Sequence, residues 1–95
     1  MIKFNELLER AKSQNIAIHT TTETQATILL EALNKKGYKW NSGHKLTTDT
    51  LYETYKENTG YTFEPRHKIA YCSLIWYQEY DYAIIEFSDI DFKEE

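Results

Sequence analysis

The sequence is poor in the residues that cofactor loops and disulfide frameworks need. Its 95 residues include only three glycines, one proline and one cysteine. Gly37, Gly43 and Gly60 are too widely spaced for a phosphate-binding loop or a dinucleotide fingerprint. A lone Cys72 excludes an intramolecular disulfide and a zinc site built from several cysteines. We therefore expect an intracellular chain that uses no cofactor.

Long apolar runs are also missing. No run approaches the roughly 20 residues that a membrane-spanning helix requires. Lys3 and Asn5 interrupt the N-terminal segment, so it lacks the apolar core of a secretory signal. We expect no membrane association, and the expected compartment is a cytoplasm.

Positive charge is scarce relative to negative charge. The chain carries 15 acidic and 11 basic residues, a formal net charge of −4. Proteins that bind duplex DNA usually present a strongly basic face, because phosphate contacts supply much of the affinity. The composition therefore disfavours duplex DNA. An acidic surface could face a basic partner or could serve only to keep the protein in solution.

The hydrophobic pattern predicts two amphipathic helices. Each has apolar residues at helical spacing on one side. The first stripe comprises Phe4, Leu7, Leu8 and Ala11, and the second comprises Ala26, Leu29, Leu30 and Leu33. Thr22 and Gln25 fit a capping box at the start of the second helix, and Gly37 can take a left-handed conformation after its end.

Short β-branched and aromatic runs predict strands at residues 16–20, 38–40, 61–64, 68–72 and 82–87. Residues 65–67 are a hairpin connection between two of them. Residues 44–60 and 73–81 are open between helix and loop, and Asp49 is a candidate cap for a short helix in the first of these segments.

These elements predict a two-layer α+β domain. We expect an antiparallel or mixed sheet of four to five strands, with both amphipathic helices packed on one face. Residues 1–95 form a single domain, made of an N-terminal helix (1–14), an α+β core (16–90) and an acidic tail (91–95).

Catalytic patterns are weak throughout. His19, His44 and His67 lie at no metal-ligand spacing, and no G-x-S-x-G motif is present. Cys72 sits in a predicted strand, where a buried thiol is usually inert. The spacing of the acidic residues does not distinguish a catalytic pair from a solvated surface. We therefore expect no catalytic residues and no metal site.

Binding features are stronger. Residues 39–45 combine an indole with polar turn residues and cations, and residues 66–68 add a small basic hairpin tip. Aromatic rings beside cations can stack a nucleobase and hold a phosphate, and the same residue types are enriched at protein–protein hot spots. Alternatively, many of these rings are simply core residues. The candidate ligand- or partner-binding residues are Trp40, Asn41, Ser42, His44, Lys45, Tyr61, Arg66, His67, Lys68, Trp76, Tyr77 and Tyr80.

Three segments resemble a pattern in small proteins encoded by bacteriophages and prophages. They are Gly37-Tyr38-Lys39-Trp40-Asn41-Ser42-Gly43, which closes a helix, Lys68-Ile69-Ala70-Tyr71, and the closing Ala83-Ile84-Ile85-Glu86-Phe87-Ser88-Asp89-Ile90. The resemblance covers roughly residues 16–90 and leaves the first helix as an addition. It implies an accessory or counter-defence protein that binds a host immune component in the bacterial cytoplasm. It defines no catalytic residues that match positions of this chain.

Three classes of function remain open. The leading hypothesis is a non-enzymatic counter-defence protein that binds a protein effector or sequesters a nucleotide-type signal, with a homo-oligomer among the possible states. The second is a small enzyme that degrades such a signal, and the third is a DNA-binding regulator.

Overall fold

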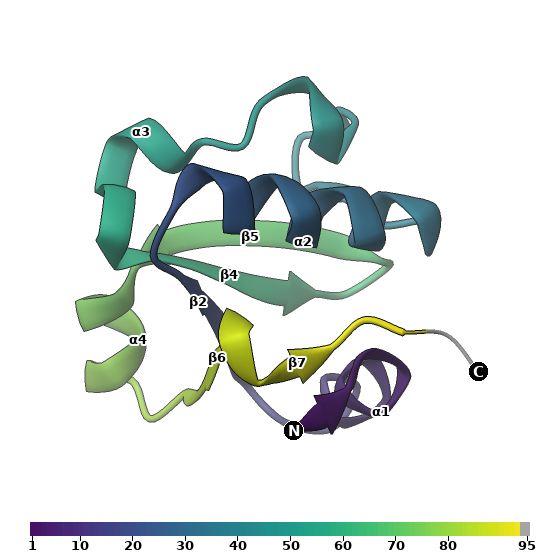
Figure 1. Ribbon diagram of the computed structural model, residues 1–95, viewed down its shortest axis with the longest axis horizontal. Coiled ribbons are helices and arrows are strands. Elements are labelled where there is room, and N and C mark those ends of the chain that lie inside the picture. The colour runs from purple at the N-terminus through teal and green to yellow at the C-terminus, as the bar shows by residue number, and fades with distance from the viewer. Residues whose placement is uncertain (94–95) are drawn as a thin grey trace.

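The computed structural model describes residues 1–93 and shows an α+β domain built around one mixed sheet (Figure 1). The strands are β1 (Ile2–Lys3), β2 (Ile16–Thr20), β3 (Lys39–Trp40), β4 (Thr59–Glu64), β5 (Lys68–Ser73), β6 (Ala83–Glu86) and β7 (Ile90–Asp91). The helices are α1 (Phe4–Arg10), α2 (Glu23–Lys35), α3 (Tyr52–Tyr55) and α4 (Leu74–Glu79). Single turns of 3-10 helix cover Leu46–Thr48, Lys56–Asn58 and Phe87–Asp89.

The main sheet has five strands in the order β3-β5-β4-β2-β6. β4 pairs antiparallel with both β2 and β5, whereas β6 is parallel to β2 and β3 is parallel to β5. The short strands β1 and β7 form a separate parallel pair. The predicted two-layer α+β class, with a mixed sheet, is confirmed.

Both predicted amphipathic helices pack into one core. Phe4 and Leu7 of α1 belong to the same buried cluster as Leu29 and Leu33 of α2, and Leu7, Leu29 and Leu33 are fully buried. The sheet meets them with alternate residues of its central strands, among them Ile18 of β2. Figure 1 shows α2 extending along the sheet and α1 beside β7.

Local sequence explains both ends of α2. The Thr22 hydroxyl accepts a hydrogen bond from the Gln25 N–H (3.1 Å), as a capping box requires. The Gln25 side chain returns to the Thr21 N–H rather than to that of Thr22. At the other end Gly37 has φ +91°, and the Tyr38 N–H donates to the Leu33 carbonyl (3.1 Å). This arrangement is a Schellman motif, as the glycine predicted.

The opposite face of the sheet is covered by α4, in the 73–81 segment that the sequence left open. Gly60 and Thr62 alternate with Tyr61 along β4, so they point away from α2. The Tyr77 ring lies against Gly60, where an added Cβ would come within 2.7 Å of two ring carbons. A glycine in this strand therefore makes room for an aromatic ring from α4.

The 44–60 segment contains one short helix, but Asp49 does not cap it. The Asp49 carboxylate accepts from the Leu51 N–H (2.9 Å) within a turn, and α3 begins only at Tyr52. Leu51 and Lys56, which flank α3, have φ values of +57° and +49°. Left-handed backbone is costly for residues with side chains, so this segment is held in shape by contacts elsewhere.

The segment predicted as an acidic tail, residues 91–95, begins within strand β7. Asp91 pairs with Lys3 in the β1–β7 ladder, and the Phe92 ring packs 5.0 Å from Phe4 and 5.2 Å from Phe87. Apolar burial therefore holds this segment against α1. Residues 94 and 95 lie outside the described part of the chain.

No helix in residues 1–93 has the length and apolar character needed to cross a membrane.

Candidate functional site

The candidate site lies at the edge of the sheet where β3 ends. β3 runs for only two residues beside β5, pairing Lys39 with Lys68 and Trp40 with Ile69. The last contact is the Asn41 N–H, which donates to the Ile69 carbonyl (3.1 Å). Beyond this point the chain turns away, whereas β5 continues to Ser73. The outer edge of β5 is therefore exposed after Ile69.

Tyr71 presents its main-chain groups at this open edge. In an antiparallel pair, successive residues of a strand direct their N–H and C=O groups alternately toward and away from the partner. Ile69 bonds outward to Asn41, so Tyr71, two residues later, also faces outward rather than toward β4. In the described structure the β3 pairing ends at Ile69, and no backbone group outside the strands bonds to the Tyr71 N–H. An unpaired donor and an unpaired acceptor thus lie side by side.

A cavity of about 440 Å³ lies against this edge. We call it the edge cavity. It falls within the range of about 300–1,000 Å³ that is typical of small-molecule sites. Its lining residues are Trp40, Asn41, Ser42, His44, Thr48, Asp49, Leu51, Ile69, Ala70 and Tyr71.

Aromatic rings support the cavity. The Trp40 and Tyr71 rings meet edge to face at 5.9 Å, and Tyr55 of α3 packs 6.0 Å from Tyr71. Trp40 is 6% exposed, and its indole Nε1 is buried without a hydrogen-bond partner among the described residues. Leaving a buried donor unpaired costs free energy. The Thr20 hydroxyl, outside the cavity, is also buried without a partner among the described residues.

Polar side chains line the cavity, but they do not form a catalytic triad. The Ser42 hydroxyl lies 2.8 Å from His44 Nδ1 in the turn. Asp49 lines the same cavity, yet its carboxylate accepts from the Leu51 N–H and makes no contact with His44 in the described structure. A base without an orienting partner, on an exposed turn, lacks the geometry that activates a serine.

The structure brings together the first part of the predicted site and separates the rest from it. Trp40, Asn41, Ser42 and His44 all line the edge cavity. Lys45 does not line it. The backbone of Lys45 forms an isolated antiparallel β-bridge with that of Lys39, just before a turn of 3-10 helix.

The basic hairpin tip lies at the other end of β5. Arg66 and His67 occupy left-handed turn positions, and the His67 ring packs 4.9 Å from Tyr38. The His67 carbonyl accepts from the Lys39 N–H, so the tip adjoins β3, but Arg66, His67 and Lys68 do not line the cavity. The predicted combination of aromatic rings with cations is therefore not assembled there.

Tyr61 and Tyr77, which were predicted to bind, are core side chains, 1% and 2% exposed, and neither lines the edge cavity. The Tyr61 hydroxyl donates to the Thr50 carbonyl (2.6 Å), and the Tyr77 hydroxyl lies 3.3 Å from that of Thr62. Burial raises the pKa of both phenols above the ordinary tyrosine value, because an ionised ring would lose its hydration.

Trp76 lies in α4 and Tyr80 is the C-cap of that helix, on the other side of β5 from the edge cavity. They are 42% and 59% exposed, and their rings stack at 4.4 Å. Neighbouring Ile75 is 59% exposed. This α4 surface is a separate apolar patch and does not belong to the cavity.

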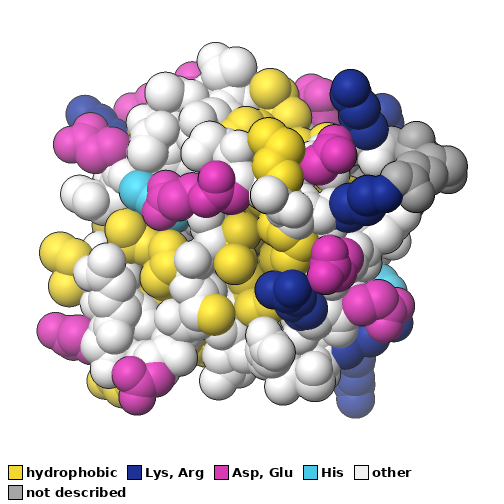
Figure 2. Space-filling model, turned by 60° about the horizontal axis from the view of Figure 1, so that its bottom comes forward, with side chains coloured by type: hydrophobic (Ala, Val, Ile, Leu, Met, Phe, Trp, Pro, Cys, Tyr) yellow, Lys and Arg dark blue, Asp and Glu magenta, His cyan; other side chains and the backbone are white. Residues whose placement is uncertain are grey.

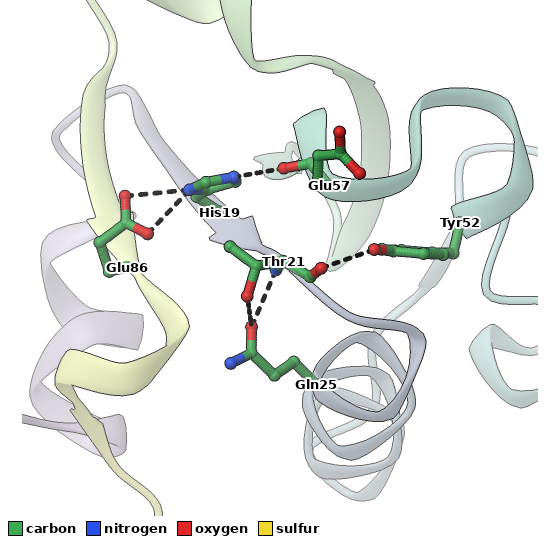
Figure 3. A network of polar contacts seen from close by, with 6 residues as sticks. All are labelled: His19, Thr21, Gln25, Tyr52, Glu57 and Glu86. Carbon is green, nitrogen blue, oxygen red and sulfur yellow. Dashed lines mark hydrogen bonds and ion pairs between the residues drawn. The ribbon is translucent and has the colours of Figure 1, made fainter.

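A polar network fixes the segment behind the cavity to the sheet (Figure 3). His19 Nδ1 lies 2.7 Å from a Glu86 carboxylate oxygen, and His19 Nε2 lies 2.6 Å from the Glu57 carbonyl. The Tyr52 hydroxyl donates to the Thr21 carbonyl (2.7 Å). Both ring nitrogens of His19 are engaged, so neither is available to a substrate. The network links β2 and β6 to the turn that follows α3.

Sequence reasoning missed six of the ten residues that line the cavity. Thr48, Asp49, Leu51, Ile69, Ala70 and Tyr71 line it, although none was among the candidate residues. The left-handed Leu51 has no glycine or asparagine to reveal it in the sequence. The alternation in residues 68–72 did predict a strand, but not that the strand would lack a neighbour.

Charge is mixed on one face of the molecule. Figure 2 shows apolar groups near the centre of this face, acidic and basic side chains close together on its right side, and no continuous basic area. Among residues 1–93, no group of three or more His, Cys, Asp and Glu side chains is arranged to hold a metal ion.

Comparison of the chain with protein-family models, with curated proteins and with solved structures gives no match.

Proposed function

We propose that this chain is a non-catalytic binding domain that takes a small planar ligand into the edge cavity. One observation carries the proposal: a cavity of about 440 Å³, bordered by aromatic rings, lies over the unpaired main-chain edge of Tyr71. Small-molecule sites combine an apolar concavity with a few polar groups that fix orientation. The unpaired Trp40 indole and the left-handed Leu51 give further support.

In its biological setting, we propose that the domain is a phage-type counter-defence protein that sequesters a nucleotide-type immune signal. The sequence resemblance suggests the setting, and the cavity favours sequestration over turnover. His19 has both ring nitrogens engaged, and Ser42 and His44 lack an orienting carboxylate. The signal-degrading enzyme and the DNA-binding regulator therefore become outcomes of the test.

A panel of nucleosides, nucleotides and cyclic nucleotides tests the proposal by thermal unfolding and equilibrium dialysis. At a concentration 100 times its Kd, a ligand should raise the Tm by on the order of 10 °C through mass action. Chromatography should recover the ligand intact after the protein is heated. Loss of intact ligand would establish an enzyme, and strongly salt-dependent retention on duplex DNA would establish a DNA-binding protein.

Two matched variant pairs locate the binding. Asn41→Ala and His44→Ala change exposed cavity residues and should weaken binding. Asn58→Ala and His67→Ala change residues outside the cavity and should not. An equal loss of affinity in both pairs of variants would contradict a ligand site in the edge cavity. So would a panel in which no compound binds.

A protein effector is the second candidate, and a separate observation favours it. Ile75, Trp76 and Tyr80 expose a cluster of large apolar side chains on α4, and aromatic side chains dominate binding energy at many interfaces. Pull-down from a bacterial lysate, with mass spectrometry for proteins and small nucleotides, separates the two. Trp76→Ala should abolish capture of an effector and leave ligand binding in the edge cavity unchanged.

A further inference from the structure

We propose that the edge cavity recognises its ligand by the hydrogen-bonding edge of a nucleobase-like heterocycle, which pairs with the main chain of Tyr71. This inference rests on the proposed function and specifies which part of the ligand is read. It assigns recognition to backbone atoms, so no side-chain motif in the sequence would reveal it.

The first step is the pattern of donor and acceptor at Tyr71. In an extended residue at a strand edge, the N–H and C=O groups point to the same side. The Asn41 contact to Ile69 places this side of Tyr71 at the end of β3, where Ile69, Ala70 and Tyr71 line the cavity. Nucleobases carry an acceptor beside a donor along their pairing edges. One base edge can therefore satisfy both groups of Tyr71 at once.

The second step is the surrounding walls. Trp40, Tyr71 and His44 bring three ring systems to the cavity, and aromatic rings stack bases of every kind. The lining also includes the amide of Asn41 and the hydroxyls of Ser42 and Thr48, which suit a heterocycle with further polar atoms. A planar ring that reaches the Tyr71 edge is thus held by both stacking and hydrogen bonds.

The third step excludes an added peptide strand. Strand addition needs several consecutive unpaired residues along an edge. Here β3 occupies the edge through Ile69, the Tyr55 ring packs on Tyr71, and α4 begins at Leu74. The open stretch is too short for an extended peptide but long enough for one ring.

The fourth step concerns charge. The described residues that line the cavity include the carboxylate of Asp49 and neither Lys nor Arg. Phosphate groups bind where cations or clustered N–H donors face them. The base should therefore supply the affinity, and a phosphate on the ligand should add little.

The experiment compares matched ligands on the full chain by calorimetry. The pairs are adenosine and N6,N6-dimethyladenosine, guanosine and 1-methylguanosine, uridine and 3-methyluridine, and cytidine and N4,N4-dimethylcytidine. Methylation removes the donor or blocks the edge while keeping the ring. We expect roughly 10- to 100-fold weaker binding of the methylated member, because Tyr71 would be left unpaired. A nucleoside and its monophosphate should bind within about threefold of each other, since no Lys or Arg lines the cavity.

The protein side of the test uses two variants of one residue. Tyr71→Pro removes the N–H donor, and proline is tolerated at outward-facing edge positions. Tyr71→Ala removes the same ring but keeps the donor. Tyr71→Ala should still discriminate between the methylated and unmethylated members, because it keeps both main-chain groups. Tyr71→Pro should bind the unmethylated member more weakly than Tyr71→Ala does, because the base acceptor loses the N–H that pairs with it. If the proline variant does not fold, the matched ligands still decide.

The outcomes separate this inference from the proposed function. If methylated and unmethylated nucleosides bind with equal affinity, the pairing with Tyr71 is wrong, but the proposed ligand site remains. Binding that requires the phosphate overturns it as well. Absence of binding by every nucleoside and nucleotide removes the proposed function, and this inference with it.

Discussion

Two aromatic clusters lie on opposite sides of β5, and they differ in what their rings enclose. The edge cluster (Trp40, Tyr55, Tyr61 and Tyr71) supports a cavity, with centroid distances of 5.9 to 6.1 Å. The rings of the α4 cluster (Trp76, Tyr77, Tyr80 and Tyr82) pack more closely against one another, with centroid distances of 4.4 to 5.8 Å. The edge cluster leaves a buried indole N–H and a strand edge unpaired, whereas in the α4 cluster Tyr77 contacts Gly60 and Thr62.

The comparison shows that ring content alone does not identify a binding site. Each cluster contains candidates predicted from the sequence: Trp40 and Tyr61 in the edge cluster, and Trp76, Tyr77 and Tyr80 in the α4 cluster. What separates them is the unpaired indole N–H of Trp40, since buried polar groups are normally paired, and the size of the adjoining cavity. The cavity is about 440 Å³ at the edge cluster and about 160 Å³ beside Trp76, Tyr77 and Tyr82. On this basis we propose that the edge cavity beside Trp40 and Tyr71 serves ligand binding, whereas the buried Tyr77 of the α4 cluster serves stability.

The largest expected effect comes from Tyr77 in the α4 cluster. Tyr77→Ala should lower the free energy of unfolding by about 3 kcal/mol, because it empties a fully packed site over Gly60. Tyr80→Ala should cost no more than about 0.5 kcal/mol, because that ring is 59% exposed. Urea unfolding measures both. Equal costs would contradict the structural role assigned to Tyr77.

A double-variant cycle tests the same contact. Gly60→Ala places a methyl group against the Tyr77 ring and should cost about 1–3 kcal/mol. The pair should be strongly non-additive, because Tyr77→Ala removes the clash.

On the cavity side, His19→Ala should cost about 2 kcal/mol, since Glu86 and the Glu57 carbonyl both lose their contact with the imidazole ring. Loss of the contact to Glu57 should loosen the turn after α3 and so weaken ligand binding in the edge cavity. The packing of α4 should not change. Calorimetry and denaturation together check the two effects. His67→Ala is the matched control, and an equal loss of affinity in that variant would argue against the network.

Alkaline pH compares one buried tyrosine from each cluster. The pKa of Tyr61 and of Tyr77 is raised in the folded state by burial. Each contribution is therefore fully present below pH 10 and is lost as pH rises above it, because the unfolded chain ionises first. At pH 11 each phenol should account for about 1 kcal/mol of lost stability. Tyr61→Phe and Tyr77→Phe should each reduce the steepness of this loss, and an unchanged pH profile in either variant would show that its phenol is not protected.

The smallest expected effect is at Lys56. Lys56→Gly should raise the free energy of unfolding by about 0.5 kcal/mol, because φ is +49° there and glycine adopts such angles without strain. The exposed Lys45, in extended backbone, is the control, and Lys45→Gly should be neutral or destabilising. A stabilised Lys45→Gly would show that the gain does not come from relieved strain.

Local patterns predicted much of the fold. The Thr22 cap, the Gly37 terminator and the hairpin around residues 65–67 each follow from short-range chemistry, and all three are confirmed. The apolar stripes of α1 and α2 likewise point into one core, as their spacing predicted.

The candidate site was predictable only in part, because its decisive features are not local. The turn after Trp40 was found from its residue types. The open edge of β5 depends on how soon β3 ends and on which strand it pairs with, and neither is encoded by a residue type at Tyr71. Tyr61 and Tyr77 could not be assigned to the core from alternation alone, since burial of a sheet face depends on what covers it.

Amide hydrogen exchange at Tyr71 tests the central claim most directly. In the free protein its N–H should exchange much faster than those of Ala70 and Cys72, which face β4 in the ladder. Saturation with a nucleoside that binds should slow exchange at Tyr71 to the level of those neighbours. A Tyr71 amide that is already as slow as Ala70 and Cys72 without ligand, or that remains fast when ligand is bound, would contradict the account.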